Sequence, residues 1–114
     1  MSRSFPKRQP DPLKVVALLL DEFGTDPNAR DDDDNTPLHL ASKIGYAEVA
    51  EILLDRGVDV NARNNDSAIP LHFASQGGHL KLVRMLLDRR ADVNACDENC
   101  NTPLHWVLQG KVVR

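Results

Sequence analysis

The chain has 114 residues, of which 41% are hydrophobic and 27% are charged, and its formal net charge at pH 7 is -3. This composition is typical of one folded globular domain and excludes collagen-like and intrinsically disordered chains. The longest wholly apolar run, residues 15–20, is much shorter than the roughly 20 residues of a membrane-spanning helix. We expect no membrane span, and no nucleic-acid binding, because that function needs Lys and Arg clustered in excess.

The first segment, residues 1–12, carries Arg3, Lys7 and Arg8 but lacks the apolar stretch and cleavage site of a secretory signal. We interpret it as an irregular basic segment. Cys96 and Cys100 are the only cysteines, too few for a disulfide framework. This favours a reducing, intracellular location, cytoplasmic, nuclear or both.

A helix is predicted over residues 15–20, followed by Gly24 and the loop Asp-Pro-Asn-Ala at 26–29. The quartet Thr-Pro-Leu-His then stands at 36–39 and 102–105, with Ile-Pro-Leu-His at 69–72, and each step is 33 residues. Self-similarity at fixed spacing indicates a repeat array. Thr36 suits a helix N-cap and Pro37 the first helical position, where no amide hydrogen is needed, so each quartet predicts a helix start.

A second helix follows the first in each complete unit. Gly45 and Gly78 permit a sharp turn between two antiparallel helices. Apolar residues at 49, 50, 53 and 54 form one stripe along the second helix, which is predicted to end at Gly57. The segment 59–62, Asp-Val-Asn-Ala, recurs at 92–95. Each unit is therefore predicted to be helix, tight turn, helix and long loop.

The quartets, the 33-residue period and the Asp-Val-Asn-Ala segments resemble ankyrin repeats. The resemblance implies an all-α solenoid of stacked helix-turn-helix units with projecting β-hairpin-like loops, or fingers. It divides the chain into a partial repeat over 13–35, full repeats over 36–68 and 69–101, and a truncated repeat over 102–114. The motif residues, which the resemblance makes structural, are Thr36, Pro37, His39, Pro70, His72, Thr102, Pro103 and His105.

The resemblance also implies that proteins bind to the fingertips and to the concave face of the first helices. We predict a non-catalytic protein-interaction module whose acidic fingertips recognise a partner with a basic patch. Tyr46 and Trp106 are candidate aromatic anchors, since both residue types are frequent in binding hot spots. The predicted partner-binding residues are Asp32, Asp33, Asn35, Lys43, Ile44, Tyr46, Asn65, Asp66, Gln76, Glu98, Asn99, Asn101, Trp106 and Gln109.

Three other interpretations stay open. The Asp31–Asp34 run has a plain alternative as a solvated loop without a partner. Cys96, Cys100 and His105 suggest zinc or redox chemistry, but a closed zinc site needs a fourth ligand, so we expect no metal, no cofactor and no enzyme activity. Asn61 and Asn94 stand where ankyrin proteins are sometimes hydroxylated, although an asparagine bonded to the loop backbone explains the residue more simply.

Departures from the family pattern predict weak points. Ile69 lacks the capping hydroxyl, which typically costs about 1 kcal/mol. Arg90 replaces a helix-ending glycine, so it adopts a left-handed conformation or the cap is built differently. Asp34, Ser67 and Cys100 replace the fingertip glycine, so the second and third fingers are expected to differ in shape from the first.

The last unit, 102–114, carries Val107 and Leu108 where the earlier units have small residues, and its second helix is missing. Bare apolar surface is expected there, because terminal repeats normally need a polar outer face. Such an end has three interpretations: end-to-end self-association through the uncapped repeat, a truncated product of a longer repeat protein, or a fragment. The second and third describe an array with no partner of its own.

Overall fold

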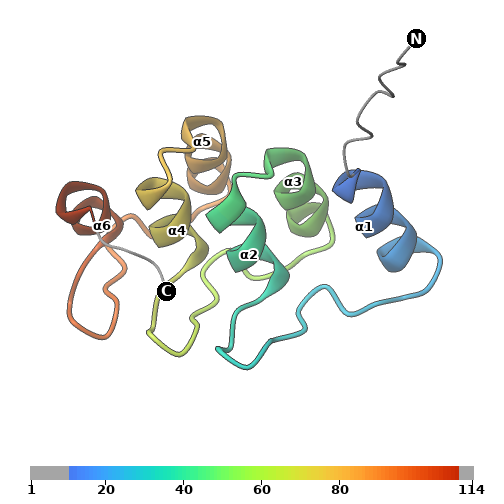
Figure 1. Cartoon of the computed structure of the whole chain (residues 1–114), viewed down its shortest axis with the longest axis horizontal. Helices are drawn as coiled ribbons and strands as arrows, with labels where there is room; N and C mark the ends of the chain where they lie inside the picture. Colours follow the sequence, from blue (N-terminus) through green and yellow to red (C-terminus); the bar gives the residue numbers. More distant parts are fainter. Residues whose placement is uncertain (1–10, 111–114) are drawn as a thin grey trace, which may run out of the picture.

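The computed structural model describes residues 11–110, which form an all-helical array (Figure 1). The predicted segments over 1–10 and 111–114 lie outside the described residues. Within residues 11–110 there is no strand, and the prediction of an all-α repeat fold is confirmed. The helices are α1 (Pro12–Asp21), α2 (Pro37–Ile44), α3 (Ala47–Asp55), α4 (Pro70–Gln76), α5 (Leu80–Asp88) and α6 (Pro103–Gln109).

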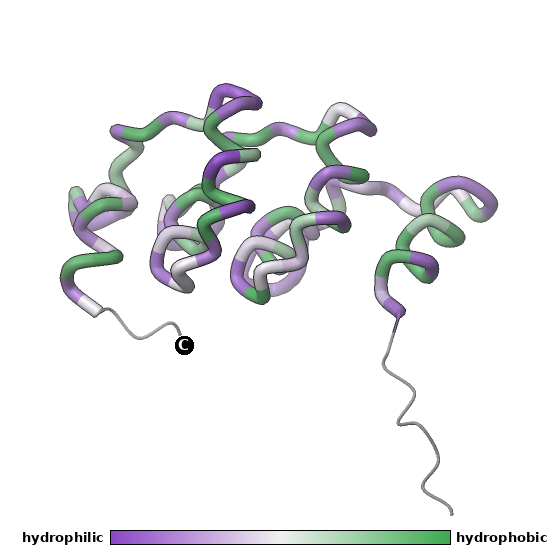
Figure 2. The backbone as a smooth tube through the Cα atoms, turned by 90° about the horizontal axis from the view of Figure 1, so that it is seen from above, coloured by the Kyte–Doolittle hydropathy of each residue, from purple (hydrophilic) through white to green (hydrophobic). Residues whose placement is uncertain are grey.

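The helices form two rows, and the long loops project together from one side of the array (Figure 1). The first helices α2, α4 and α6 pack on one another in sequence, and the second helices α1, α3 and α5 do the same. Seen from above in Figure 2, the helix pairs stand side by side. Stacking of this kind buries one continuous core, since each unit contacts only its neighbours.

Two helix starts are capped as the quartets predict. Thr36 Oγ1 accepts a hydrogen bond from the His39 amide at 3.3 Å, and His39 Nδ1 accepts from the Thr36 amide at 3.1 Å. Thr102 and His105 repeat this reciprocal pair at 3.4 and 3.0 Å. First-turn amides that no helical carbonyl can reach are thereby satisfied.

The start of α4 differs, because Ile69 makes no side-chain cap. His72 Nδ1 still accepts from the Ile69 amide at 3.1 Å, so half of the reciprocal pair remains. The Ile69 side chain is fully buried in the main core. Burying an isoleucine is worth about 1.5–3 kcal/mol, more than the roughly 1 kcal/mol of the lost cap. The predicted loss of the side-chain cap is confirmed, and the burial of Ile69 offsets its cost.

The fingers share one backbone conformation despite their different residues. Asp34, Ser67 and Cys100 take φ values of 64°, 61° and 64°. The expectation that the second and third fingers differ in shape is wrong at this position, because the surrounding bonds impose the left-handed conformation on all three. Arg90 likewise adopts φ 72°, close to the 81° of Gly57, so the left-handed alternative holds.

The main core runs through the units that contain α1 to α5. Its buried apolar side chains come from both helix rows, with Leu38, Leu53, Leu71 and Leu86 among the most enclosed. A second, small cluster joins Ala68, Phe73 and Trp106 on the finger side of the first helices. That cluster supports the surface described next.

Candidate interaction groove

A groove of about 350 Å³ lies between the fingers and the first helices. It crosses the three units, so residues from all three fingers and from α2, α4 and α6 contribute to it. Its lining residues are Asp33, Asn35, His39, Leu40, Lys43, Asn64, Asn65, Asp66, Phe73, Asp97, Glu98, Asn99 and Trp106.

Each finger is held by one side-chain oxygen at equivalent positions. Asp31 Oδ1 accepts from the Asp33 and Asn35 amides, both at 2.9 Å. Asn64 Oδ1 accepts from the amides two and four residues later at 2.9 and 3.0 Å, and Asp97 Oδ1 does so at 2.8 and 2.9 Å. Short polar side chains that bond the backbone just ahead stabilise such turns. These three residues were missed as finger determinants, although their 33-residue spacing was available as a signal.

Backbone bonds join neighbouring fingers laterally. The Asn65 amide donates to the Asp33 carbonyl at 3.1 Å, and the Glu98 amide donates to the Asp66 carbonyl at 2.8 Å. The finger positions are therefore fixed relative to one another at equivalent points of the repeat.

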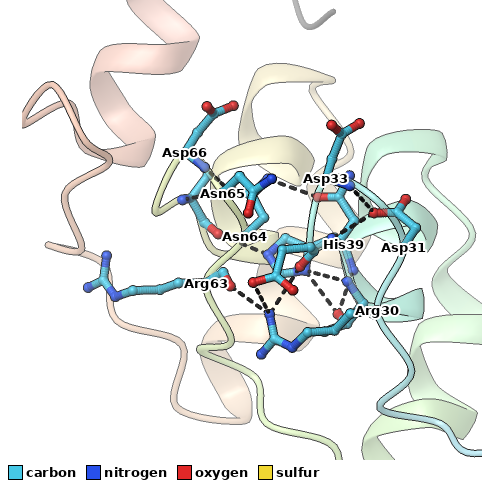
Figure 3. A network of polar contacts seen from close by, with 12 residues as sticks. Arg30, Asp31, Asp33, His39, Arg63, Asn64, Asn65 and Asp66 are labelled. Carbon is cyan, nitrogen blue, oxygen red and sulfur yellow. Dashed lines mark hydrogen bonds and ion pairs between the residues drawn. The ribbon is translucent and has the colours of Figure 1, made fainter.

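Two arginines, at positions 30 and 63, add a second lateral series of hydrogen bonds, and Figure 3 shows those made by Arg30. Arg30 Nη1 donates to the Asp34 carbonyl of its own finger at 3.0 Å and to the Arg63 carbonyl of the next at 2.7 Å. Arg63 Nη1 makes the equivalent bonds to Ser67 and Cys96, both at 2.8 Å. Each guanidinium thus stabilises the turn of its own finger and links that finger to the next one.

Two quartet histidines connect the first helices to the following finger. His39 Nε2 donates to the Ala68 carbonyl and His72 Nε2 donates to the Asn101 carbonyl, each at 2.9 Å. A carbonyl only accepts, so both rings carry hydrogen on Nε2 and accept on Nδ1. Burial lowers the pKa of both histidines below the ordinary value, against an opposing contribution from these carbonyl bonds. A neutral ring with a hydrogen bond at each nitrogen suits a structural role.

The floor of the groove is a row of apolar side chains, Leu40, Phe73 and Trp106, at the 33-residue period. Phe73 and Trp106 meet edge to face with ring centroids 5.3 Å apart. Trp106 Nε1 donates to Asp97 Oδ2 at 2.8 Å. Trp106 is only 6% exposed, so its expected role as an exposed aromatic anchor is corrected: the indole supports the floor and orders the third finger.

The structure separates the other predicted binding residues into two sets. Those that line the groove with Trp106 are Asp33, Asn35, Lys43, Asn65, Asp66, Glu98 and Asn99. Those that do not are Asp32, Ile44, Tyr46, Gln76, Asn101 and Gln109. Asn35 and Asn101 are half-buried, and their side-chain oxygens accept from Asn64 and Gln109, which makes both part of the finger framework.

The charge of the groove is predominantly acidic. Among its lining residues Lys43 is the only Lys or Arg, against four carboxylates. In Figure 3 the carboxylates of Asp33 and Asp66 point away from the polar network that shapes the fingers. Both residues are exposed. The equivalent placement of these two residues on neighbouring fingers gives the groove a negative rim.

The remaining candidate positions lie away from this groove. Asn61 Nδ2 donates to the Arg90 carbonyl at 3.2 Å and its Oδ1 accepts from the Asp92 amide at 2.8 Å, whereas the Asn94 side chain is exposed. Cys96 and Cys100 are exposed free thiols. Across residues 11–110, no three His, Cys, Asp or Glu side chains are grouped to hold a metal ion. None of the helices described has the length and apolar character to span a bilayer.

These features define a helical repeat protein with an elongated groove beside its first helices. The family model described as "Ankyrin repeats (3 copies)" matches residues 8–97 and 64–114, and the chain belongs to the ankyrin-repeat family. Repeats of this family generally mediate protein–protein interaction.

Similar curated proteins match over 42 residues, 37% of the chain. A putative ankyrin repeat protein of Fowlpox virus (strain NVSL) is 48% identical there, and protein fem-1 homolog C of Homo sapiens and of Mus musculus is 43% identical. The matched segment spans 10% of the viral protein and 7% of the fem-1 homologs. The likeness therefore concerns the repeats and not those whole proteins.

Proposed function

We propose that the chain is a non-catalytic module that binds a partner protein in the groove between the fingers and the first helices. The carrying observation is the groove itself, which crosses three units and combines an apolar floor with the outward carboxylates of Asp33 and Asp66. A groove that crosses three units and is lined by four carboxylates suits an extended protein segment better than a small substrate, because small-molecule sites are usually mostly apolar.

The partner is expected to present a basic patch. Carboxylates on adjacent fingers attract Lys and Arg side chains, speed the encounter and fix the register of the bound segment. The floor residue Leu40 is exposed beside this rim and offers apolar contact. An extended segment with basic residues toward the fingers and apolar residues toward the first helices would satisfy both surfaces.

The test is a pull-down from cell lysate with cross-linking through Lys43, which lies inside the groove. The chain is compared with a variant carrying Asp33→Lys and Asp66→Lys. The matched control carries Glu51→Lys and Asp88→Lys, the same charge change at exposed positions of the second helices.

The proposal predicts a protein that cross-links through a basic segment and that is retained by the original and the control but lost from the groove variant. Circular dichroism verifies that all three chains fold. If the groove variant and the control retain the protein equally, the groove is not the binding site. If the original chain retains no protein, the alternative of an array without its own partner is favoured.

A second candidate is self-association through α6, which one observation favours. The outer side of α6 exposes three large apolar side chains, Leu104, Val107 and Leu108. Contiguous exposed apolar side chains commonly mark an interaction site.

A further inference from the structure

We infer that α6 of one copy and α1 of a second copy pair as the two helices of a single ankyrin unit, joining copies head to tail. This rests on the second candidate above and names the surface that receives α6. Within residues 11–110, α6 is a first helix without a second helix packed on it, and α1 is a second helix without a first helix. The described array therefore displays the two halves of one unit at its opposite ends.

The apolar side of α6 is the side that complete units bury. Leu38 in α2 and Leu71 in α4 are 0% and 2% exposed, and both lie in the main core with second-helix residues. Leu104 holds the same place in α6 and is 65% exposed. The greater exposure of Leu104 follows from the lack of a second helix packed on α6, because all three residues are leucines at the same position of the quartet.

The apolar side of α1 is the reciprocal surface. Val15 aligns with Val49 in α3 and with Leu82 in α5, which are 8% and 1% exposed, yet Val15 is 53% exposed. Leu19 aligns with Leu53 and shows the same contrast, 44% against 2%. In Figure 2, α1 at the right is drawn largely in the hydrophobic colour. These are the positions that α3 and α5 bury in complete units.

A hollow beside α1 supports the same occupant. It has a volume of about 160 Å³ and is lined mainly by apolar side chains, including Val16, Leu19 and Leu20 of α1 with Val49 and Leu53 of α3. A branched aliphatic side chain fills such a hollow with favourable dispersion contacts. Leu108, the most exposed of the three apolar α6 side chains, is of that type.

The proposed contact has the helix arrangement of the α2–α3 and α4–α5 pairs, except that Val107 and Leu108 take the places of the small residues Ala41 and Ser42. Each copy would use a different face, so the contact is heterologous and a dimer still displays one free α1 and one free α6. Association should therefore proceed beyond the dimer as concentration rises. A single helix pair is a small interface, and weak association is expected.

The test uses the full 114-residue chain in sedimentation velocity from about 10 µM to about 1 mM, the range suited to weak interfaces. Two single variants, Leu104→Glu and Val15→Glu, each place a carboxylate in one of the two faces. Val93→Glu is the matched control, since Val93 is 53% exposed and lies outside α1 and α6.

The original chain and the control should form dimers and larger species as concentration increases. Each single variant alone should stay monomeric, whereas their equimolar mixture should form a dimer and nothing larger, because each retains one intact face. A monomeric original chain, or a mixture that stays monomeric, would overturn the inference.

If Leu104→Glu dissociates the oligomers and Val15→Glu leaves them intact, self-association through α6 stands but α1 is not its partner. The groove variant Asp33→Lys with Asp66→Lys should oligomerise like the original chain. That result separates this inference from the proposal of partner binding in the groove.

Discussion

Arg90 holds a backbone conformation that favours glycine, with φ 72° against 81° at the equivalent Gly57. A side chain with a Cβ in this conformation costs roughly 1–2 kcal/mol. Replacement by glycine recovers that cost but raises the entropy of the unfolded chain, which costs about 0.4–1 kcal/mol. Arg90→Gly should therefore be more stable than Arg90→Ala by about 0.5–1 kcal/mol, because both variants lose the charge and only one keeps the Cβ.

The assay is urea unfolding followed by the fluorescence of Trp106, the single tryptophan. The midpoint should shift without a change in slope, as expected when stability alone is altered. Gly57→Ala is the reciprocal control, and its free energy of unfolding should fall by a similar amount. The new Cβ would meet no atom within 4 Å, so only the backbone conformation disfavours alanine there. Equal stability of the two Arg90 variants would refute the argument.

Three further predictions concern the repeat framework. Burial lowers the pKa of His39 below its ordinary value of about 6.5, so the unfolded chain binds a proton at a higher pH than the folded chain does. The free energy of unfolding should therefore fall as the pH drops below about 6.5. Titration of the His39 ring by NMR checks the direction of the shift, and a midpoint above 6.5 would contradict it. Trp106→Phe removes the hydrogen bond to the Asp97 carboxylate and should lower the free energy of unfolding by about 1.5–3 kcal/mol. Unfolding followed by circular dichroism measures this, and an unchanged free energy would contradict the prediction. Gly45→Ala would place a Cβ 2.6 Å from the ring of His79, so it should destabilise the chain about 1 kcal/mol or more beyond Gly57→Ala in the same assay.

The sequence was sufficient for the starts of α2, α4 and α6, because the determinants of a helix start are local. A threonine cap, a proline at the first helical position and a histidine three residues beyond the cap act within one turn. The same reasoning predicted the loss of the cap at Ile69, but the compensating burial could not be predicted, because it depends on neighbouring helices.

The groove was predicted only in part, for a related reason. Fingertip acids such as Asp33 and Asp66 follow from the period, but burial of Trp106 depends on its edge contact with Phe73 and on an acceptor in the third finger. Similarly, three unlike residues at 34, 67 and 100 share one conformation because the preceding Asp31, Asn64 and Asp97 close each turn. Side-chain partners from other units decide both features.

The paired bonds of Arg30 and Arg63 have a mechanical consequence. Each guanidinium bonds a carbonyl of its own finger and one of the next, so tilting one finger strains its neighbour. The three fingers should therefore move together as one rigid unit, and a partner that contacts a single fingertip would displace it only by moving all three. Such a surface loses little conformational freedom when it is occupied, which lowers the ordering cost of association.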